Sequence, residues 1–131
     1  MRDDRCGEQE GQHMTKVVIH IFHGDDDSIS YGSRLSERIR QIAADKQAEV
    51  EVFCFGPAQA RLTGGPGDEA RAVHNRRLDD LIAAGVPVGA CVNAAKADGT
   101  DEELRKRGFT LEVARDAFLR FALEGATVIT F

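Results

Sequence analysis

Cys91 and Asn93, in the second half of the chain, have the residue types and spacing of a reactive site. They lie in the segment VPVGACVNAAKADG (86–99), where a short apolar run gives way to small residues typical of the first turn of a helix. The free backbone N–H groups at the start of a helix favour a cysteine thiolate. Cys91 is therefore the candidate nucleophile of this chain.

Strand alternation bears on whether this thiol can react. If 86–92 forms a strand, Cys91 shares a face with Gly89 and Asn93, and the even-numbered residues of the run face the core. That arrangement predicts a less apolar environment for the thiol. The competing interpretation is an inert, buried cysteine, because cysteine is among the residue types most often found in protein interiors. The sequence leaves both interpretations open.

Asn93 and His23 are candidate binding residues. Asn93 either orients a substrate or caps the following helix, and the two roles are compatible. His23 follows the apolar run KVVIHIF (16–22), where an imidazole can carry a proton near neutral pH. The alternative for His23 is a solvated loop side chain.

Asp25, Asp26 and Asp27 form an acidic cluster directly after the same run. Clustered carboxylates can hold magnesium, as in receiver domains. A receiver also needs an aspartate after its third strand and a lysine after its fifth, but 91–93 reads CVN and 130–131 reads TF. The cluster is thus expected to complement the dipole of a following helix, and no metal site or cofactor is predicted.

These residues must be positioned by alternating strands and helices. Short apolar runs bounded by Gly, Pro or Asp predict strands, and apolar residues at helical spacing predict helices between them. The expected strands span 16–22, 50–55, 86–92, 109–113 and 126–131. The expected helices are 29–46 capped by Ser28 or Ser30, 73–82 closed by Gly85, a short helix capped by Asn93, 100–107, and 118–123 ended by Gly125.

Strands that are apolar throughout and alternate with helices are typical of a parallel sheet covered on both faces. The predicted fold class is α/β: a three-layer α/β/α sandwich with a mostly parallel five-stranded sheet, formed by 15–131 as a single domain. Residues 1–14 lack periodicity and are expected to be a disordered extension. Ligands of such sheets bind beyond the carboxyl ends of the strands. Gly56 and Pro57, which end the second strand, therefore join the candidate binding residues.

Composition limits the classes of function. The net charge of −5 and the mixing of basic with acidic residues argue against nucleic-acid binding. No apolar run approaches the roughly 20 residues needed to cross a bilayer, and the first residues lack the apolar core of a signal peptide, so a cytoplasmic location is expected. Cys6, Cys54 and Cys91 show no CxxC spacing, which predicts free thiols rather than disulfides or a zinc site.

Three longer segments occur in a recognisable order: VEVFCFGPAQARL (50–62), LDDLIAAGVPVGACVNAAKADG (78–99) and EVARDAFLRFALEGATVITF (112–131). Together they resemble the DsrE/DsrF-like (DsrEFH/YchN-like) sulfur-relay family. In that family a strand ends in a Gly-Pro-type turn, a strand ending in Cys-x-Asn leads into a small-residue helix, and an amphipathic helix precedes the last strand. The resemblance spans roughly 16–131.

The resemblance implies a function in an intracellular sulfur relay. It implies that the chain carries sulfur as a persulfide on Cys91, a sulfurtransferase role without a cofactor, with donor and acceptor proteins as partners. It also implies a homo-oligomer, such as a trimer or a hexamer, and no nucleic-acid or membrane partner. The chain departs from the family pattern at Val92, where a glycine is frequent, and in the acidic segment HGDDDS (23–28).

A second function fits the same residues. Beyond Cys91 and His23 the chain offers few clear nucleophilic or acid-base groups, which favours a non-catalytic oligomeric subunit that binds a small ligand or another protein. The last predicted helix supports an assembly, because Phe118, Leu119, Phe121 and Leu123 cover more than one of its faces.

Overall fold

A computed structural model describes residues 15–65 and 67–131, so the predicted extension 1–14 lies outside the described residues. The strands are β1 (Thr15–Ile21), β2 (Ala48–Cys54), β3 (Val88–Cys91), β4 (Thr110–Glu112) and β5 (Thr127–Thr130). The α-helices are α2 (Asp26–Ala43), α3 (Glu69–Ala83), α4 (Val92–Asp98), α5 (Asp101–Arg107) and α6 (Ala114–Leu123). Two 3₁₀ helices, η1 (Ala44–Lys46) and η2 (Gly56–Leu62), follow α2 and β2.

The strands form one sheet in the order β4-β3-β2-β1-β5, and every neighbouring pair is parallel. The chain steps outward from β1 to β4 and then returns, so that β5 lies on the other side of β1. The order of the strands thus reverses between β1 and β5, which is where sheets of this kind commonly bind ligands. The predicted α/β class is confirmed, and the sheet is parallel throughout.

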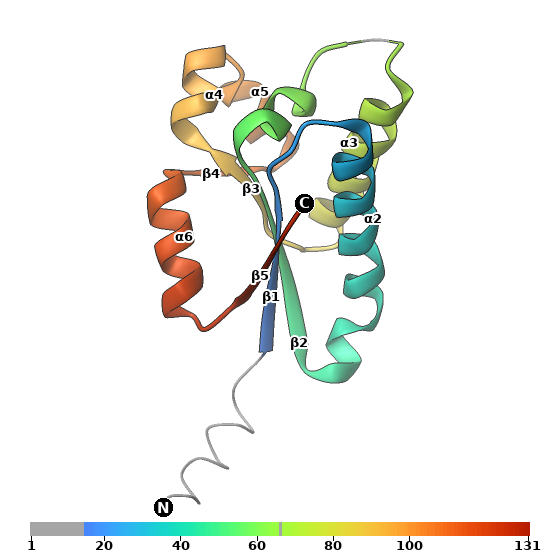
Figure 1. Ribbon diagram of the computed structural model, residues 1–131, viewed down its shortest axis with the longest axis vertical. Coiled ribbons are helices and arrows are strands. Elements are labelled where there is room, and N and C mark those ends of the chain that lie inside the picture. The colour runs from blue at the N-terminus through green and yellow to red at the C-terminus, as the bar shows by residue number, and fades with distance from the viewer. Residues whose placement is uncertain (1–14, 66) are drawn as a thin grey trace, which may run out of the picture.

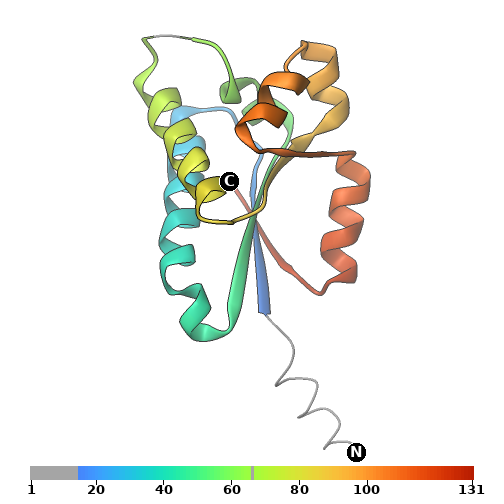
Figure 2. The same cartoon turned by 180° about the vertical axis from the view of Figure 1, so that it is seen from behind.

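The helices form two outer layers around this sheet. α2 and α3 cover one face and α6 covers the other, while α4 and α5 lie at the carboxyl end of the sheet, at the top of Figure 1. The view from behind in Figure 2 shows the same separation of α6 from α2 and α3. The predicted three-layer sandwich is therefore confirmed.

Alternation along the strands divides the core into two clusters. Ile19 and Ile21 of β1 belong to the larger cluster under α2 and α3, whereas Val18 belongs to the smaller cluster under α6. Cys54 lies fully buried in the larger cluster, and this burial raises the pKa of its thiol to about 12. A thiol with that pKa is not a nucleophile at neutral pH.

The first helix begins earlier than predicted. Asp25 is its N-cap: one carboxylate oxygen accepts from the Ser28 backbone N–H at 3.1 Å, and the other accepts from the Ser28 hydroxyl at 2.8 Å. The predicted caps Ser28 and Ser30 are therefore wrong, because an aspartate three residues before Ser28 already satisfies its backbone. Asp26 and Asp27 occupy the first turn, which confirms the expected helix-start role of the acidic cluster.

Candidate functional site

The candidate residues meet at the carboxyl end of the sheet because all the strands run the same way. Cys91 is the last residue of β3, His23 follows β1, and Gly56 and Pro57 begin η2 directly after β2. α4, α5 and η2 gather around this end (Figure 1). The topology therefore places these four residues at one edge of the sheet, where the sequence predicted a site.

The side chain of Cys91 is more deeply buried than the sequence suggested. Only 6% of the residue's surface is exposed, and Cys91 belongs to the apolar cluster that contains Phe53, Ala117 and Phe121 under α6. Alternation correctly placed Cys91 and Gly89 on one face, but the expectation of a less apolar environment is wrong. The reason is α6, which the sequence could not assign to a particular face and which covers this one.

Gly89 makes room for an aromatic ring beside Cys91. A Cβ atom added at Gly89 would lie 2.9 Å from the Thr110 carbonyl oxygen and 3.2 Å from the Phe53 ring. Any larger residue would therefore push Phe53 away from β3. The packing of Phe53 over Cys91 therefore depends on glycine at position 89.

Gln59 of η2 holds the backbone of Cys91 from both sides. Its Nε2 donates to the Cys91 carbonyl oxygen at 2.8 Å, and its Oε1 accepts from the Cys91 N–H at 3.2 Å. The pairing of β2 with β3 ends one residue earlier, at Cys54 and Ala90. The Gln59 side-chain amide therefore takes the place of a β2 backbone partner for Cys91. Gln59 is itself only 5% exposed. It fixes the junction between β3 and α4, and the sequence prediction missed it.

Gly56 and Pro57 direct the chain so that Gln59 reaches Cys91. Gly56 has φ +77°, and a side chain there would collide with the ring of Phe22. Pro57 sits in the first turn of η2, where its missing N–H has no cost. These two residues therefore form the turn; whether they also bind a ligand stays a prediction.

Asn93 does not cap the helix. α4 begins at Val92, so the capping position falls on Cys91, whose side chain makes no capping hydrogen bond. Asn93 is the second residue of α4, and its side chain is exposed. The predicted third strand was too long, because β3 ends at Cys91 and its last predicted residue, Val92, is helical. A binding role for the exposed Asn93 amide stays a prediction.

Two histidines of β1 and its following loop differ in exposure. His23 is exposed, which fits both a proton carrier and a solvated loop side chain, so its role stays a prediction. His20 is 8% exposed, with its Nδ1 3.1 Å from the Thr130 hydroxyl and its ring packed among Phe22, Phe55 and Phe118. Burial lowers the pKa of His20, and the charge of His23 lowers it further. The neutral form of His20 is thus favoured.

An ionic network fixes α6 over the face that carries Cys91. Arg120 of α6 pairs with Glu51 of β2 at 2.8 Å and with Glu112 of β4 at 2.9 Å, and Lys16 of β1 pairs with Glu51 at 2.6 Å. Hydrogen bonds to Glu51 and Glu112 raise the pKa of Arg120 above its ordinary value. Glu51 is buried but has two cationic partners, so its charge is compensated.

The described residues contain no group of three or more His, Cys, Asp or Glu side chains placed to hold a metal ion. Asp25, the first residue of the acidic cluster, is used as a helix cap. Of the helices in 15–65 and 67–131, none is long and apolar enough to cross a membrane.

The fold has relatives among solved structures. The YchN protein of E. coli matches with a TM-score of 0.64 and 18% sequence identity, over 90% of this chain and 99% of YchN. A conserved protein of unknown function from Bacteroides thetaiotaomicron matches with a TM-score of 0.64 and 9% identity, over 87% of this chain and 94% of that one. No protein-family model and no curated protein matches the sequence. The chain therefore has a YchN-like, DsrE-like fold.

Proposed function

We propose that this protein carries sulfur as a persulfide on Cys91. The observation that supports this function best is the position of Cys91 as the last residue of β3, directly before α4, at the carboxyl edge of a parallel sheet. Ligands of parallel sheets bind at this edge. The DsrE-like fold and the Cys-x-Asn segment, which resembles the sulfur-relay family, point to the same role.

The reaction would be an exchange between sulfur atoms. The Cys91 thiolate attacks the outer sulfur of a donor persulfide, R–S–SH; the donor S–S bond breaks, a new S–S bond forms on Cys91, and the donor leaves as a thiolate. An acceptor thiolate then removes the outer sulfur in the same way. One S–S bond is exchanged for another in each step, so no oxidant or reductant is consumed. His23, exposed at the same edge, would carry the thiol proton.

The burial of Cys91 adds a condition to this function. With 6% of its surface exposed, Cys91 cannot meet a protein donor unless α6 and the β3–α4 junction held by Gln59 open locally. Such local opening requires less free energy than global unfolding. The sulfur transfer would therefore be limited by this local opening.

Intact-mass spectrometry tests this proposal. The full chain with Cys6→Ser is incubated with a cysteine desulfurase and cysteine, and the expected product carries one additional sulfur atom. Cys91→Ser should abolish the adduct, whereas the matched control Cys54→Ser should retain it because Cys54 is buried in the other cluster. An adduct that persists in Cys91→Ser would refute the assignment.

The alternative is a non-catalytic oligomeric subunit, and two exposed leucines favour it. Leu119 and Leu123 of α6 are 59% and 79% exposed and lie one turn apart, so together they offer an apolar surface to another subunit. This function predicts a stable homo-oligomer, a trimer or a hexamer, and no persulfide. Light scattering on the wild-type chain and on Leu119→Lys tests this alternative. If the wild type is a monomer, or if Leu119→Lys leaves the assembly intact, this surface is not the interface.

A further inference from the structure

The two edges of the sheet are built differently. β4 is short and ends in Glu112, whose carboxylate is held by Arg120, and a charged edge resists pairing with other chains. β5, with the sequence TVIT, carries no charge and no proline, and all four of its residues are exposed. Within the described residues its one strand neighbour is β1. β5 therefore lacks the features that usually protect an edge strand.

On its outer side, the backbone of β5 has pairing groups that no strand in 15–65 or 67–131 uses. Phe131, the next residue, donates its N–H to the His20 carbonyl at 2.8 Å and accepts from the Phe22 N–H at 2.8 Å, so its polar groups point towards β1. The direction of these groups alternates from residue to residue in a strand. Val128 and Thr130 must therefore direct their N–H and C=O groups away from the sheet, where an added strand could pair with them.

A cavity on the α2 side adjoins this edge. Its volume is about 320 Å³, and Tyr31, Leu35 and Phe131 line it together with Arg34 and Arg38. Ile129 faces the same side, because it pairs in register with Ile19 of the cluster under α2. Tyr31 is 60% exposed and Ile129 is 38% exposed. A strand added to β5 could place an apolar side chain in this cavity.

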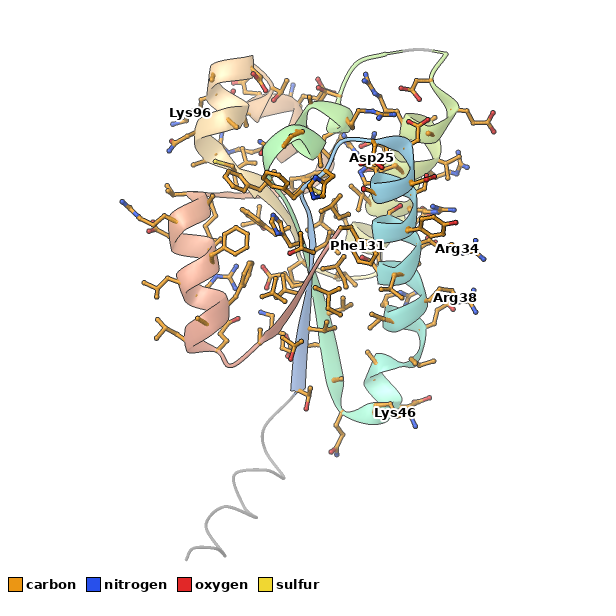
Figure 3. The ribbon with its side chains drawn as sticks, in the orientation of Figure 1. Asp25, Arg34, Arg38, Lys46, Lys96 and Phe131 are labelled. Carbon is orange, nitrogen blue, oxygen red and sulfur yellow. The ribbon has the colours of Figure 1, made fainter. Side chains whose placement is uncertain are left out.

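Arg34 and Arg38 determine the charge of what could bind there. Both are exposed and lie one turn apart on α2, and Figure 3 shows their side chains extending outward from this helix. Neither forms an ion pair with any residue in 15–65 or 67–131, whereas Arg61, Arg107 and Arg120 all do. A partner that approaches β5 on the α2 side would therefore gain from carboxylates.

A second copy of this chain fits the edge poorly. Antiparallel pairing of two β5 strands about a twofold axis perpendicular to the sheet would place both α2 helices on the same side of the joined sheet. Arg34 and Arg38, which have no ion-pair partner among the described residues, would then face their counterparts in the other copy, and like charges across an interface cost affinity. The charge on this side favours an acidic partner instead.

We propose that the α2–β5 edge, defined by Tyr31, Arg34, Arg38, Ile129 and Phe131, binds an extended acidic segment of a partner polypeptide as a sixth strand of the sheet. Backbone pairing with Val128 and Thr130 supplies the register, an apolar side chain enters the cavity, and carboxylates of the segment pair with the two arginines. This interaction is independent of sulfur chemistry at Cys91.

Peptide selection tests the proposal with the full chain. A random peptide library displayed on phage is selected against the wild-type protein and, in parallel, against Arg34→Ala/Arg38→Ala. The expected peptides are rich in Asp and Glu alternating with apolar or β-branched residues, and they bind the double variant about tenfold or more weakly. Arg40→Ala, which removes an exposed arginine of the same helix that lines a different cavity, should bind them as the wild type does.

Synthetic peptides then test backbone pairing without altering the protein. The best selected peptide is compared with the same peptide N-methylated at alternate residues, which removes the N–H groups that an added strand requires. Affinity should fall about tenfold or more in one of the two methylation registers. Selected peptides without acidic residues, equal binding to the double variant, or undiminished binding of both methylated peptides would each overturn the proposal. Light scattering that shows a wild-type dimer dissociated by Val128→Pro, which removes an outward N–H of β5, would overturn it in favour of a second copy.

Discussion

Cys54 and Cys91 lie near the ends of adjacent strands but face opposite sides of the same sheet. Cys54 is embedded in the larger cluster beneath two helices, α2 and α3, and is fully buried. Cys91 belongs to the smaller cluster beneath the single helix α6, which ion pairs help to hold. The face under α2 and α3 thus holds the larger share of the core, and the proposed function requires the face under α6 to open more readily.

Phe121→Ala should have the largest effect on the face under α6. Phe121 is fully buried and packs against Phe53 and Phe118 with ring centroids 5.9 Å and 5.5 Å apart. Its truncation should cost about 3–5 kcal/mol of unfolding free energy. Native-state hydrogen exchange should accelerate more in α6 than in α2. Equal acceleration in both helices would show that the two faces open as one unit.

Acidification should act mainly on the face under α2 and α3. His74 of α3 is fully buried there, with its Nδ1 3.0 Å from the Ile29 carbonyl oxygen. Burial, with smaller effects of the charges on Arg61, Arg107 and Arg77, lowers the pKa of His74 from 6.5 to about 4. Because the folded-state pKa is depressed, the unfolded chain takes up the proton first, and stability is lost as pH falls below 6.5.

This loss should amount to about 3 kcal/mol by pH 4, measured by urea denaturation at a series of pH values. His20, whose pKa is also lowered, contributes in the same direction. His74→Phe should flatten the slope between pH 6.5 and pH 4, whatever it does to stability at neutral pH. An unchanged slope in this variant would show that other groups cause the acid sensitivity.

Arg120→Met should destabilise the face under α6 by about 2 kcal/mol, because Glu51 is then left with Lys16 as its cationic partner. The matched control is Arg115→Met on the same helix, whose pair with Asp116 is exposed and should be worth close to nothing. Denaturant titrations of the two variants measure the difference. Equal effects would mean that the network does not hold α6 in place.

Gln59→Leu should have the smallest effect on stability, about 1–2 kcal/mol, and a larger one on Cys91. Loss of both amide bonds leaves the buried N–H of Cys91 unpaired and removes one of the bonds to its carbonyl oxygen, so the β3–α4 junction opens more often. Iodoacetamide labelling of Cys91 should rise about tenfold. Asn75→Leu, which removes hydrogen bonds to the carbonyls of Arg61 and Arg71, is the control and should leave that rate nearly unchanged. A similar rise in both variants would contradict a specific role for Gln59.

Much of the fold could be predicted because it depends on local patterns. The apolar runs around Ile19, Val52 and Ala90 are continuous, which indicates strands covered on both sides, and the helices between them require parallel pairing. The order of the strands could not be predicted, since it depends on which face of the sheet each connecting helix packs against. The face covered by α6, and hence the burial of Cys91, depends on the same packing.

The candidate site was predicted in position but not in detail. Cys91, His23 and Gly56 reach the carboxyl edge because each follows or ends a predicted strand. Gln59 was missed because its partner is the backbone of a residue 32 positions away, and no local pattern encodes such a contact. The available signal was weak: a polar residue in the turn after the Gly56–Pro57 bend, between two small apolar residues, Ala58 and Ala60.

The most direct test of the central claim is the rate of native-state alkylation of Cys91 relative to Cys54. The full chain with Cys6→Ser is treated with iodoacetamide at increasing low concentrations of urea, and each site is quantified by peptide mass spectrometry. Cys91 should react faster than the protein unfolds, at a rate that depends weakly on urea, whereas Cys54 should react only at the rate set by global unfolding. If both cysteines react at equal rates with the same steep dependence on urea, the claim that local opening of the α6 face makes Cys91 reactive is contradicted.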